Sequence, residues 1–136
     1  MFVANYMTKN PVTVSADTSV DEATGLMKMN HFRRLPVMKD GKVIGIISDR
    51  DISRIAPSPA TTLSKYEINS LLAKMPVTDV MSAPIVSVSD EATVEEAALL
   101  MCNNKIGGMP VVSSVGVLVG IITETDIFRV FVKVMG

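Results

Sequence analysis

The sequence predicts a mixed fold of helices and small sheets, of the α+β or α/β class, made from two copies of one unit. Three observations lead to this prediction. The chain has 136 residues, 48% of them hydrophobic, which is enough for one shared core and too little for two ordinary independent domains. A repeat covers most of the chain. Within each copy, short strand-like runs alternate with runs at helical spacing.

The repeat consists of two stretches of similar sequence. YMTKNPVTVSADTSVDEA, at residues 6–23, returns as VMSAPIVSVSDEATVEEA at 80–97, an offset of 74. After one extra residue in the second copy the offset is 75, so that GIISDRD at 45–51 matches GIITETD at 120–126. Neither copy alone can cover both faces of so small a sheet. We therefore expect the two copies to pack together around a common core with approximate twofold symmetry.

Each copy opens with a short strand, which a helix follows. Ser19 with Glu22, and Thr93 with Glu96, have the spacing of a capping box, in which side chains satisfy free amide groups at the start of a helix. The apolar residues after each cap recur on one helical face, which we expect to be buried: Val20, Ala23, Met27, Val94, Ala97, Ala98 and Met101.

A hairpin comes next in each copy, and a second helix follows the hairpin. RLPVM and VIGIIS are β-rich runs separated by KDGK, whose Asp-Gly pair is a turn signal. MPVV and VLVGIIT are separated by a Ser/Gly turn. The second helices are predicted at residues 50–56 and 124–135, and Pro57 and Pro59 end the first of them in a loop.

The segment between the copies is predicted to be partly helical. Ser64 and Glu67 form another capping box, and apolar residues follow at helical spacing: Ile68, Leu71, Leu72 and Met75. We therefore divide the chain into a first unit at 1–58, a linker at 59–76 and a second unit at 77–136, which together form one compact module.

Charge and composition argue against nucleic-acid binding and against a membrane span. Thirteen basic and fourteen acidic side chains give a net charge of −1, and 4% of the residues are aromatic, so neither a basic surface nor stacking platforms are expected. No apolar run approaches the ~20 residues of a membrane helix. The start MFVANYM has no secretory pattern, and the single cysteine, Cys102, excludes an internal disulfide. We expect a cytoplasmic protein.

The sequence carries no pattern of a catalytic or metal site. It has no glycine-rich phosphate loop and no set of nucleophile, base and orienting residue. Cys102 has no second cysteine with which to share a metal ion, and His31, the single histidine, follows a predicted helix end. We therefore expect no enzymatic activity, no metal site and no required cofactor.

Taken in order, these motifs resemble a known family. M…P-V-x-V, the capped helix, RRLPV, the glycine-containing hairpin and G-h-h-[S/T]-x-x-D, where h is hydrophobic, together resemble the cystathionine-β-synthase (CBS) domain. Their tandem occurrence resembles a CBS pair, or Bateman module. The resemblance implies two βαββα units packed through their small sheets with pseudo-twofold symmetry. It also implies two clefts, which in many members bind adenosine-containing ligands and regulate an attached enzyme or channel.

The strand-to-helix corners supply the first candidate site residues. Ser48 and Thr123 end a predicted strand, and Asp51 and Asp126 follow three residues later. In one interpretation, hydroxyl and carboxylate cap the next helix. In the other, the carboxylate accepts hydrogen bonds from the two hydroxyls of a ribose, while the hydroxyl and the helix-start amides face a phosphate. The resemblance implies the second role, and the two interpretations are compatible.

The two copies differ just ahead of the PV pair. The first copy has Arg33 and Arg34, and the second has Gly107 and Gly108 at the matching positions. Guanidinium groups suit bidentate contacts to phosphate, and the resemblance implies that basic residues here reach the phosphates of a nucleotide. The alternative is that both arginines only coat a solvated strand entry. A phosphate-preferring cleft is thus expected in the first copy, and a weaker or less charge-selective cleft in the second.

The leading hypothesis is a regulatory module that senses an adenosine-containing nucleotide. AMP, ADP, ATP and S-adenosylmethionine are the candidate ligands, and the ligand is expected to change conformation or assembly. The alternative is an interaction or dimerisation module without a ligand. The linker faintly resembles that of acetoin-utilisation regulators, in which a small further domain commonly follows the CBS pair. The partners expected are a nucleotide, a second copy of the chain and a regulated enzyme or downstream domain.

The C-terminal helix is the basis for expecting a homodimer. Ile127, Val130, Phe131 and Val134 form one apolar stripe, which we expect to face the core. A second stripe on the same helix consists of Phe128, Val132 and Met135. One core cannot bury both stripes, and large exposed apolar patches usually mark an interaction surface. The alternatives are that the second stripe covers the linker helix through Leu71 and Leu72, or docks a downstream domain.

Overall fold

The computed structural model describes residues 1–55, 62–82 and 85–136 and divides into two compact units. The first-repeat unit contains Val12–Asp40 and Ile44–Pro84. The second-repeat unit contains Met1–Pro11, Gly41–Val43 and Ile85–Gly136. Each unit therefore combines most of one sequence repeat with the opening segment of the other. The predicted loop at Pro57 and Pro59, and the predicted boundary after residue 58, lie outside the described residues.

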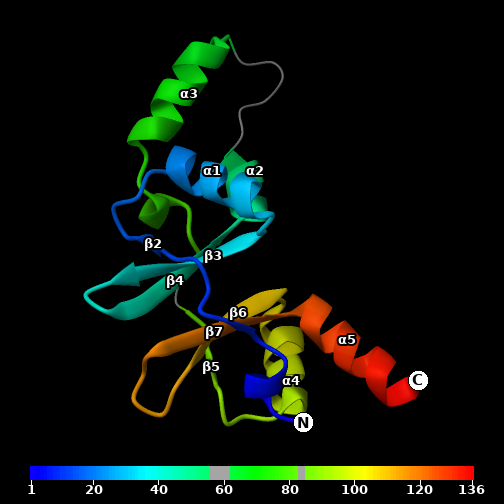
Figure 1. The fold of residues 1–136 in the computed structure, drawn as a ribbon. Helices are drawn as coiled ribbons and strands as arrows, with labels where there is room; N and C mark the ends of the chain where they lie inside the picture. Colours follow the sequence, from blue (N-terminus) through cyan, green and yellow to red (C-terminus); the bar gives the residue numbers. More distant parts are fainter. Residues whose placement is uncertain (56–61, 83–84) are drawn as a thin grey trace. The chain divides into compact units, whose positions relative to one another are not determined.

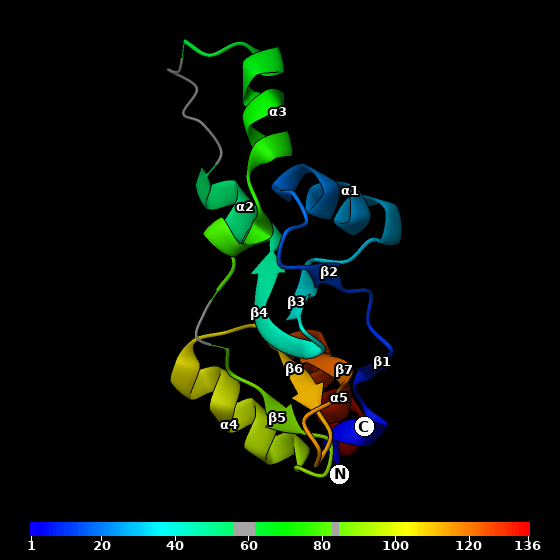
Figure 2. The same ribbon diagram turned by 90° about the vertical axis from the view of Figure 1, so that its left-hand side faces the viewer.

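The first-repeat unit has a three-stranded sheet in the order β2-β3-β4, together with helices (Figure 1). Its elements are β2 (Val14–Ser15), α1 (Val20–Asn30), β3 (Arg34–Lys39), β4 (Lys42–Ser48), α2 (Asp49–Ile55), α3 (Lys65–Lys74) and η2 (Val77–Asp79), and the first two residues of β4 are grouped with the second-repeat unit. β2 runs parallel to β3. α1 packs against β3, α2 and α3. α3 extends beyond α1 and α2 in Figure 2, and none of its residues is buried.

The second-repeat unit repeats this arrangement with a four-stranded sheet in the order β1-β7-β6-β5. Its elements are η1 (Val3–Asn5), β1 (Thr8–Lys9), β5 (Val88–Ser89), α4 (Val94–Asn104), β6 (Gly108–Val112), β7 (Leu118–Thr123) and α5 (Glu124–Met135). β6 and β7 form an antiparallel hairpin, and β5 runs parallel to β6. The prediction of a mixed fold with small sheets, one hairpin in each repeat and helices at the expected places is therefore confirmed.

The predicted capping boxes start the helices where expected. The hydroxyl oxygens of Ser19, Thr93 and Ser64 each accept the amide N–H three residues later, at 3.1 Å. The buried faces of α1 and α4 consist of Val20, Ala23, Met27, Val94, Ala97 and Met101. Ala98, which was expected on the buried face, is only half-buried.

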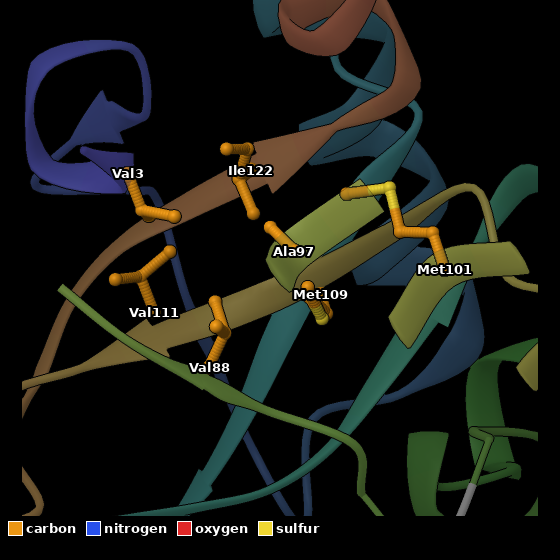
Figure 3. Packing of buried hydrophobic residues seen from close by; sticks show 7 residues of the cluster. All are labelled: Val3, Val88, Ala97, Met101, Met109, Val111 and Ile122. Atoms are coloured by element: carbon orange, nitrogen blue, oxygen red, sulfur yellow. The ribbon is translucent and has the colours of Figure 1, made fainter. Parts of the chain in front are cut away.

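The opening segment of each repeat packs in the unit that holds the other repeat. β1 pairs antiparallel with β7, and Val3 from the same segment is fully buried in the second-repeat core. Figure 3 shows Val3 beside Val111 and Ile122 of that core. In the first-repeat unit, the fully buried Val77 takes the corresponding place. Each core therefore depends on residues from both repeats.

A glycine in the second strand of each hairpin lets the opening segment of the other repeat pack close to that strand. A Cβ atom at Gly120 would lie 2.5 Å from the sulfur of Met7 and 2.8 Å from the carbonyl oxygen of Thr8. At Gly45 it would lie 2.5 Å from the sulfur of Met81. All three distances are shorter than the contacts that Cβ atoms make in folded proteins. The glycine of each G-h-h-[S/T]-x-x-D motif therefore serves packing of the opening segment over the strand.

One expectation about α5 is wrong. Phe131 and Val134 were assigned to the core face, but they are 62% and 59% exposed. Val130 is buried and Ile127 half-buried, and both lie in the first two turns of the helix, where α5 contacts α4 and β7. The later turns continue past the sheet, as Figure 1 shows. The exposed apolar surface of α5, here called the α5 patch, therefore includes both stripes: Phe128, Phe131, Val132, Val134 and Met135.

Candidate functional site

The first candidate corner lies where β4 ends and α2 begins. The Ser48 amide donates a hydrogen bond to Oδ2 of Asp51 at 2.9 Å, and the Asp51 amide donates to the Ser48 hydroxyl oxygen at 3.1 Å. The Asp51 side chain is 6% exposed, so this carboxylate is buried within its own unit. The corner is thus a reciprocal cap, as one of the two sequence interpretations predicts.

The second corner, between β7 and α5, has the same form. Thr123 and Asp126 make a capping box in which the Thr123 amide donates to Oδ2 of Asp126 at 2.9 Å. The Thr123 hydroxyl also donates to that oxygen, at 3.2 Å. Asp126 is 5% exposed. Both predicted pairs of residues are therefore brought together, each within one unit.

The other carboxylate oxygen has weaker partners at both corners. Oδ1 of Asp51 accepts the Ser82 hydroxyl at 3.3 Å and lies 3.7 Å from a guanidinium nitrogen of Arg54. Oδ1 of Asp126 lies 3.5 Å from a guanidinium nitrogen of Arg129. Both arginines are mostly in solvent, so these ion pairs add little stability. Oδ1 is therefore the oxygen that can change partners without loss of the cap.

Arg33 and Arg34 lie at the entry to β3, beside the first corner. The Asp49 amide donates to the carbonyl oxygen of Arg33 at 2.9 Å, which fixes the start of β3 against the start of α2. The Glu124 amide makes the matching bond to the carbonyl oxygen of Gly107 at 2.9 Å. Arg33 is exposed and Arg34 half-buried. Among the described residues, neither guanidinium makes a hydrogen bond or an ion pair.

The sequence led us to expect that the amides at the start of α2 face a phosphate, but in the structure they donate hydrogen bonds within the chain. Those of Asp49, Arg50 and Asp51 donate to Arg33, to the Asp49 side chain and to Ser48, respectively. The chain itself has satisfied them, because the cap and the β3 entry lie within reach. At this corner, free donors for an anion are therefore side chains rather than helix-start amides.

Ser82 also lies at the first corner, where the sequence reasoning did not place it. It belongs to the second repeat but forms a bridge with Ile46 of β4, which brings its hydroxyl to Asp51. The available signal was its match to Thr8, which pairs with β7 in the other unit. Ser82 reaches the first corner because its segment pairs with β4, which is distant in the sequence. A local sequence pattern does not indicate such pairing.

A separate hollow lies at the far end of β3. It has a volume of about 560 Å³, and its lining includes Ser15, Asp17, Lys39 and Thr78. The Ser15 hydroxyl donates to the Asp17 carboxylate and lowers the pKa of that exposed group. None of the corner residues lines this hollow.

Other reactive side chains do not gather into a site. His31 ends α1 in the left-handed backbone conformation, and Cys102 is exposed and forms no disulfide. Within residues 1–55, 62–82 and 85–136, no group of three or more His, Cys, Asp or Glu side chains is placed to hold a metal ion. The helices in those same ranges include none with the length and apolar character needed to span a membrane.

Comparison with known proteins identifies similar chains. The family model described as CBS domain matches residues 3–58 and 77–133. A CBS domain-containing protein of Dictyostelium discoideum is 33% identical over 136 residues, covering 99% of this chain and 94% of that protein. An inosine-5'-monophosphate dehydrogenase of Korarchaeum cryptofilum is 34% identical over 124 residues, covering 91% of this chain but 23% of the enzyme.

Solved structures with the same fold include CBS pairs with bound ligands. CBSX2 in complex with AMP has a TM-score of 0.77 and 30% identity, covering 99% of this chain and 98% of that chain. The CBS domain pair of protein MJ0100, in complex with 5'-methylthioadenosine and S-adenosyl-L-methionine, has a TM-score of 0.78 and 26% identity, covering 96% and 95%. A candidate acetoin utilization protein (AcuB) from Vibrio cholerae has a TM-score of 0.76 and 31% identity, covering 99% and 93%.

Proposed function

Because the chain belongs to the CBS-domain family and carries the domain twice, we propose that it is a regulatory module that senses an adenosine-containing nucleotide. The ligand is of the AMP, ADP or ATP type and binds at the Ser48–Asp51 corner. The observation that carries the proposal is the buried Asp51 carboxylate, in which Oδ2 holds the cap and Oδ1 has only weak partners. The pairs solved with AMP and with S-adenosyl-L-methionine support it.

The proposed binding step exchanges the partners of Oδ1. A ribose presents two neighbouring hydroxyl donors, and a carboxylate oxygen accepts more than one hydrogen bond. The Ser82 bond is long at 3.3 Å, and the Arg54 pair joins a guanidinium that is 74% exposed. The ribose can therefore replace both partners while Oδ2 continues to cap α2.

The phosphates of the same ligand go to the arginines at the β3 entry. Arg33 and Arg34 have unengaged guanidinium groups in the described part of the chain, and the Arg33 backbone is bonded to the start of α2. Guanidinium forks bind phosphate oxygens in pairs. The sugar and the phosphates of one nucleotide thus meet different residues of the same unit.

The Thr123–Asp126 corner is proposed to bind more weakly, or to prefer a less charged adenosine ligand such as S-adenosylmethionine. It offers the same buried carboxylate. Gly107 and Gly108 replace the two arginines, so the phosphate donors are missing there. Ligand preference is therefore expected to differ between the two corners.

The response to the ligand is proposed to be a change of conformation or assembly, with no chemical reaction. α2 and α5 start at the two corners, so they are the elements nearest to a bound ligand. We propose that a second copy of the chain covers the α5 patch and makes a homodimer in the cytoplasm. A regulated enzyme or a downstream domain would receive the signal.

A thermal-shift screen tests this function. A ligand that binds only the native state stabilises it by about 2.7 kcal/mol when present at about 100 times its Kd. At least one of AMP, ADP, ATP and S-adenosylmethionine should therefore raise the unfolding temperature, inorganic phosphate alone should not, and each nucleotide should be recovered unchanged. If none of the four ligands raises the temperature, or if the chain hydrolyses one in an Asp51-dependent way, the proposed function is wrong.

The second candidate is an interaction module without a ligand, as in a fragment of an acetoin-utilisation-type regulator. The caps at both corners are complete without any ligand, and the α5 patch is available for a partner. The likeness to AcuB from Vibrio cholerae supports this alternative. It predicts self-association that none of the four adenosine ligands alters.

A further inference from the structure

We propose that the hollow at the far end of β3 binds a free α-amino acid with an apolar side chain. Its volume of about 560 Å³ falls within the range of about 300–1,000 Å³ that small-molecule sites occupy. All of its lining residues belong to the first-repeat unit, and none of them belongs to the corner between β4 and α2. The proposal therefore concerns a second site and does not depend on nucleotide binding at that corner.

Charged side chains of both signs border the hollow. Asp17 follows β2, Lys39 ends β3 and Asp40 begins the hairpin turn. Within the described part of the chain, the Lys39 ammonium makes no hydrogen bond and pairs with neither carboxylate. The hydroxyl of Ser15 donates to the Asp17 carboxylate and lowers its pKa, so this group stays ionised. A ligand with both a positive and a negative charge therefore meets an opposite charge for each.

The backbone at the hollow differs from its counterpart in the second-repeat unit. There, the Ala4 amide donates a hydrogen bond to the carbonyl oxygen of Asp90 at 3.2 Å. By the offset of 74, the matching residues are Thr78 and Ala16, and both line the hollow. Across residues 1–55, 62–82 and 85–136, no hydrogen bond joins the Thr78 amide to the Ala16 carbonyl, and neither group has another partner. One N–H donor and one C=O acceptor are therefore available to a bound molecule.

Together these groups match the ammonium, the carboxylate and the side chain of an amino acid. The Lys39 ammonium and the Thr78 amide are donors for a carboxylate. The Ala16 carbonyl oxygen and the two carboxylates of the lining are acceptors for an ammonium group. The half-buried Met38 and Pro76 give the lining an apolar part, against which an apolar side chain can leave water. A molecule with only one of the two charges satisfies only half of the polar groups.

Titration of the full chain with leucine, followed by proton–nitrogen NMR spectra, tests the proposal. Leucine should shift the amide signals of Asp17, Lys39 and Thr78 and leave the signal of Asp51 in place. N-acetylleucine lacks the ammonium group and leucinamide lacks the carboxylate, so each should bind roughly tenfold more weakly, the effect of one lost charged hydrogen bond. Glycine should also bind more weakly than leucine, because it has no apolar side chain to bury.

Exchange of one residue between the repeats provides the matched variants. Lys39→Ser gives the hollow the residue that the second repeat has at Ser113, and Lys42→Ser removes an exposed charge of the same hairpin outside the lining. Lys39→Ser should bind leucine about tenfold more weakly than wild type, and Lys42→Ser should bind it equally well. Equal binding of leucine by Lys39→Ser and wild type would overturn the proposal. It would also fail if leucine at millimolar concentration shifts none of the hollow's signals, or if leucine and both blocked forms bind equally. None of these outcomes bears on AMP binding at the corner, so the two proposals fail separately.

Discussion

Single glycines control how closely the opening segments approach the strands. A methyl group at Gly120 would meet the Met7 sulfur and the Thr8 carbonyl oxygen, and the backbone oxygen cannot move as a flexible side chain can. Gly120→Ala should therefore destabilise the protein by about 1–3 kcal/mol in denaturant unfolding. Gly25→Ala is the matched control, because nothing lies within 4 Å of its added Cβ in α1.

The control should stabilise the protein slightly, by roughly 0.5–1 kcal/mol, since alanine is the better helix former. Equal stability of Gly120→Ala and wild type would show that the opening segment does not press on β7 as described. The sequence alone did not indicate this role, because Met7 lies more than a hundred positions from Gly120. A local pattern marks a glycine in a strand but not its neighbour.

Helices and hairpins were the most predictable elements, because their signals are local. Ser19, Thr93 and Ser64 cap helices as their spacing predicts, and the Asp40–Gly41 pair has the positive φ angles that its hairpin turn requires. Pairing between distant segments was not predictable in this way. The positions of β1 beside β7 and of Ser82 beside Asp51 depend on contacts across the whole chain.

The outer half of α5 was misjudged for a related reason. Helical periodicity shows that a face is apolar, but it does not show how far the sheet extends beneath it. Lys133 still ties this half of the helix to the opening segment, with its amine 3.4 Å from the Tyr6 hydroxyl and 5.6 Å from the ring centroid. This contact lies at the surface of the unit, and the α5 patch stays exposed.

Self-association through the α5 patch has a direct test. Phe128→Glu places a charge in the centre of the proposed contact, and an unpaired buried charge should weaken the dimer by roughly a hundredfold or more. Sedimentation of dilute protein should show a dimer for wild type and a monomer for Phe128→Glu. Val115→Glu, at another exposed apolar residue in the hairpin turn, should leave the dimer intact.

Wild-type protein that sediments as a monomer would contradict the proposal, as would a Phe128→Glu variant that remains dimeric. A dimer that dissociates equally in Val115→Glu would place the contact elsewhere.

For the chain as a whole, the two repeats share the scaffold and differ in the charged side chains beside the corners. Both repeats retain the cap at the corner, the glycine in the hairpin and the methionine that packs over it. They differ in the arginines, which no fold element requires. The repeat therefore made the fold and the positions of Asp51 and Asp126 predictable. We propose that the identity of the ligand and its affinity depend on side chains that differ between the copies.

Calorimetric titration of AMP into wild type, Asp51→Ala and Asp126→Ala tests the proposed site most directly. Both variants lose a cap of the same kind, at a cost of about 1 kcal/mol, so they control for each other in stability. Asp51→Ala should bind AMP roughly tenfold to a hundredfold more weakly than wild type, and Asp126→Ala within about twofold of it. Wild-type protein that binds no AMP, or an Asp51→Ala variant that binds it as tightly as wild type does, would contradict this account.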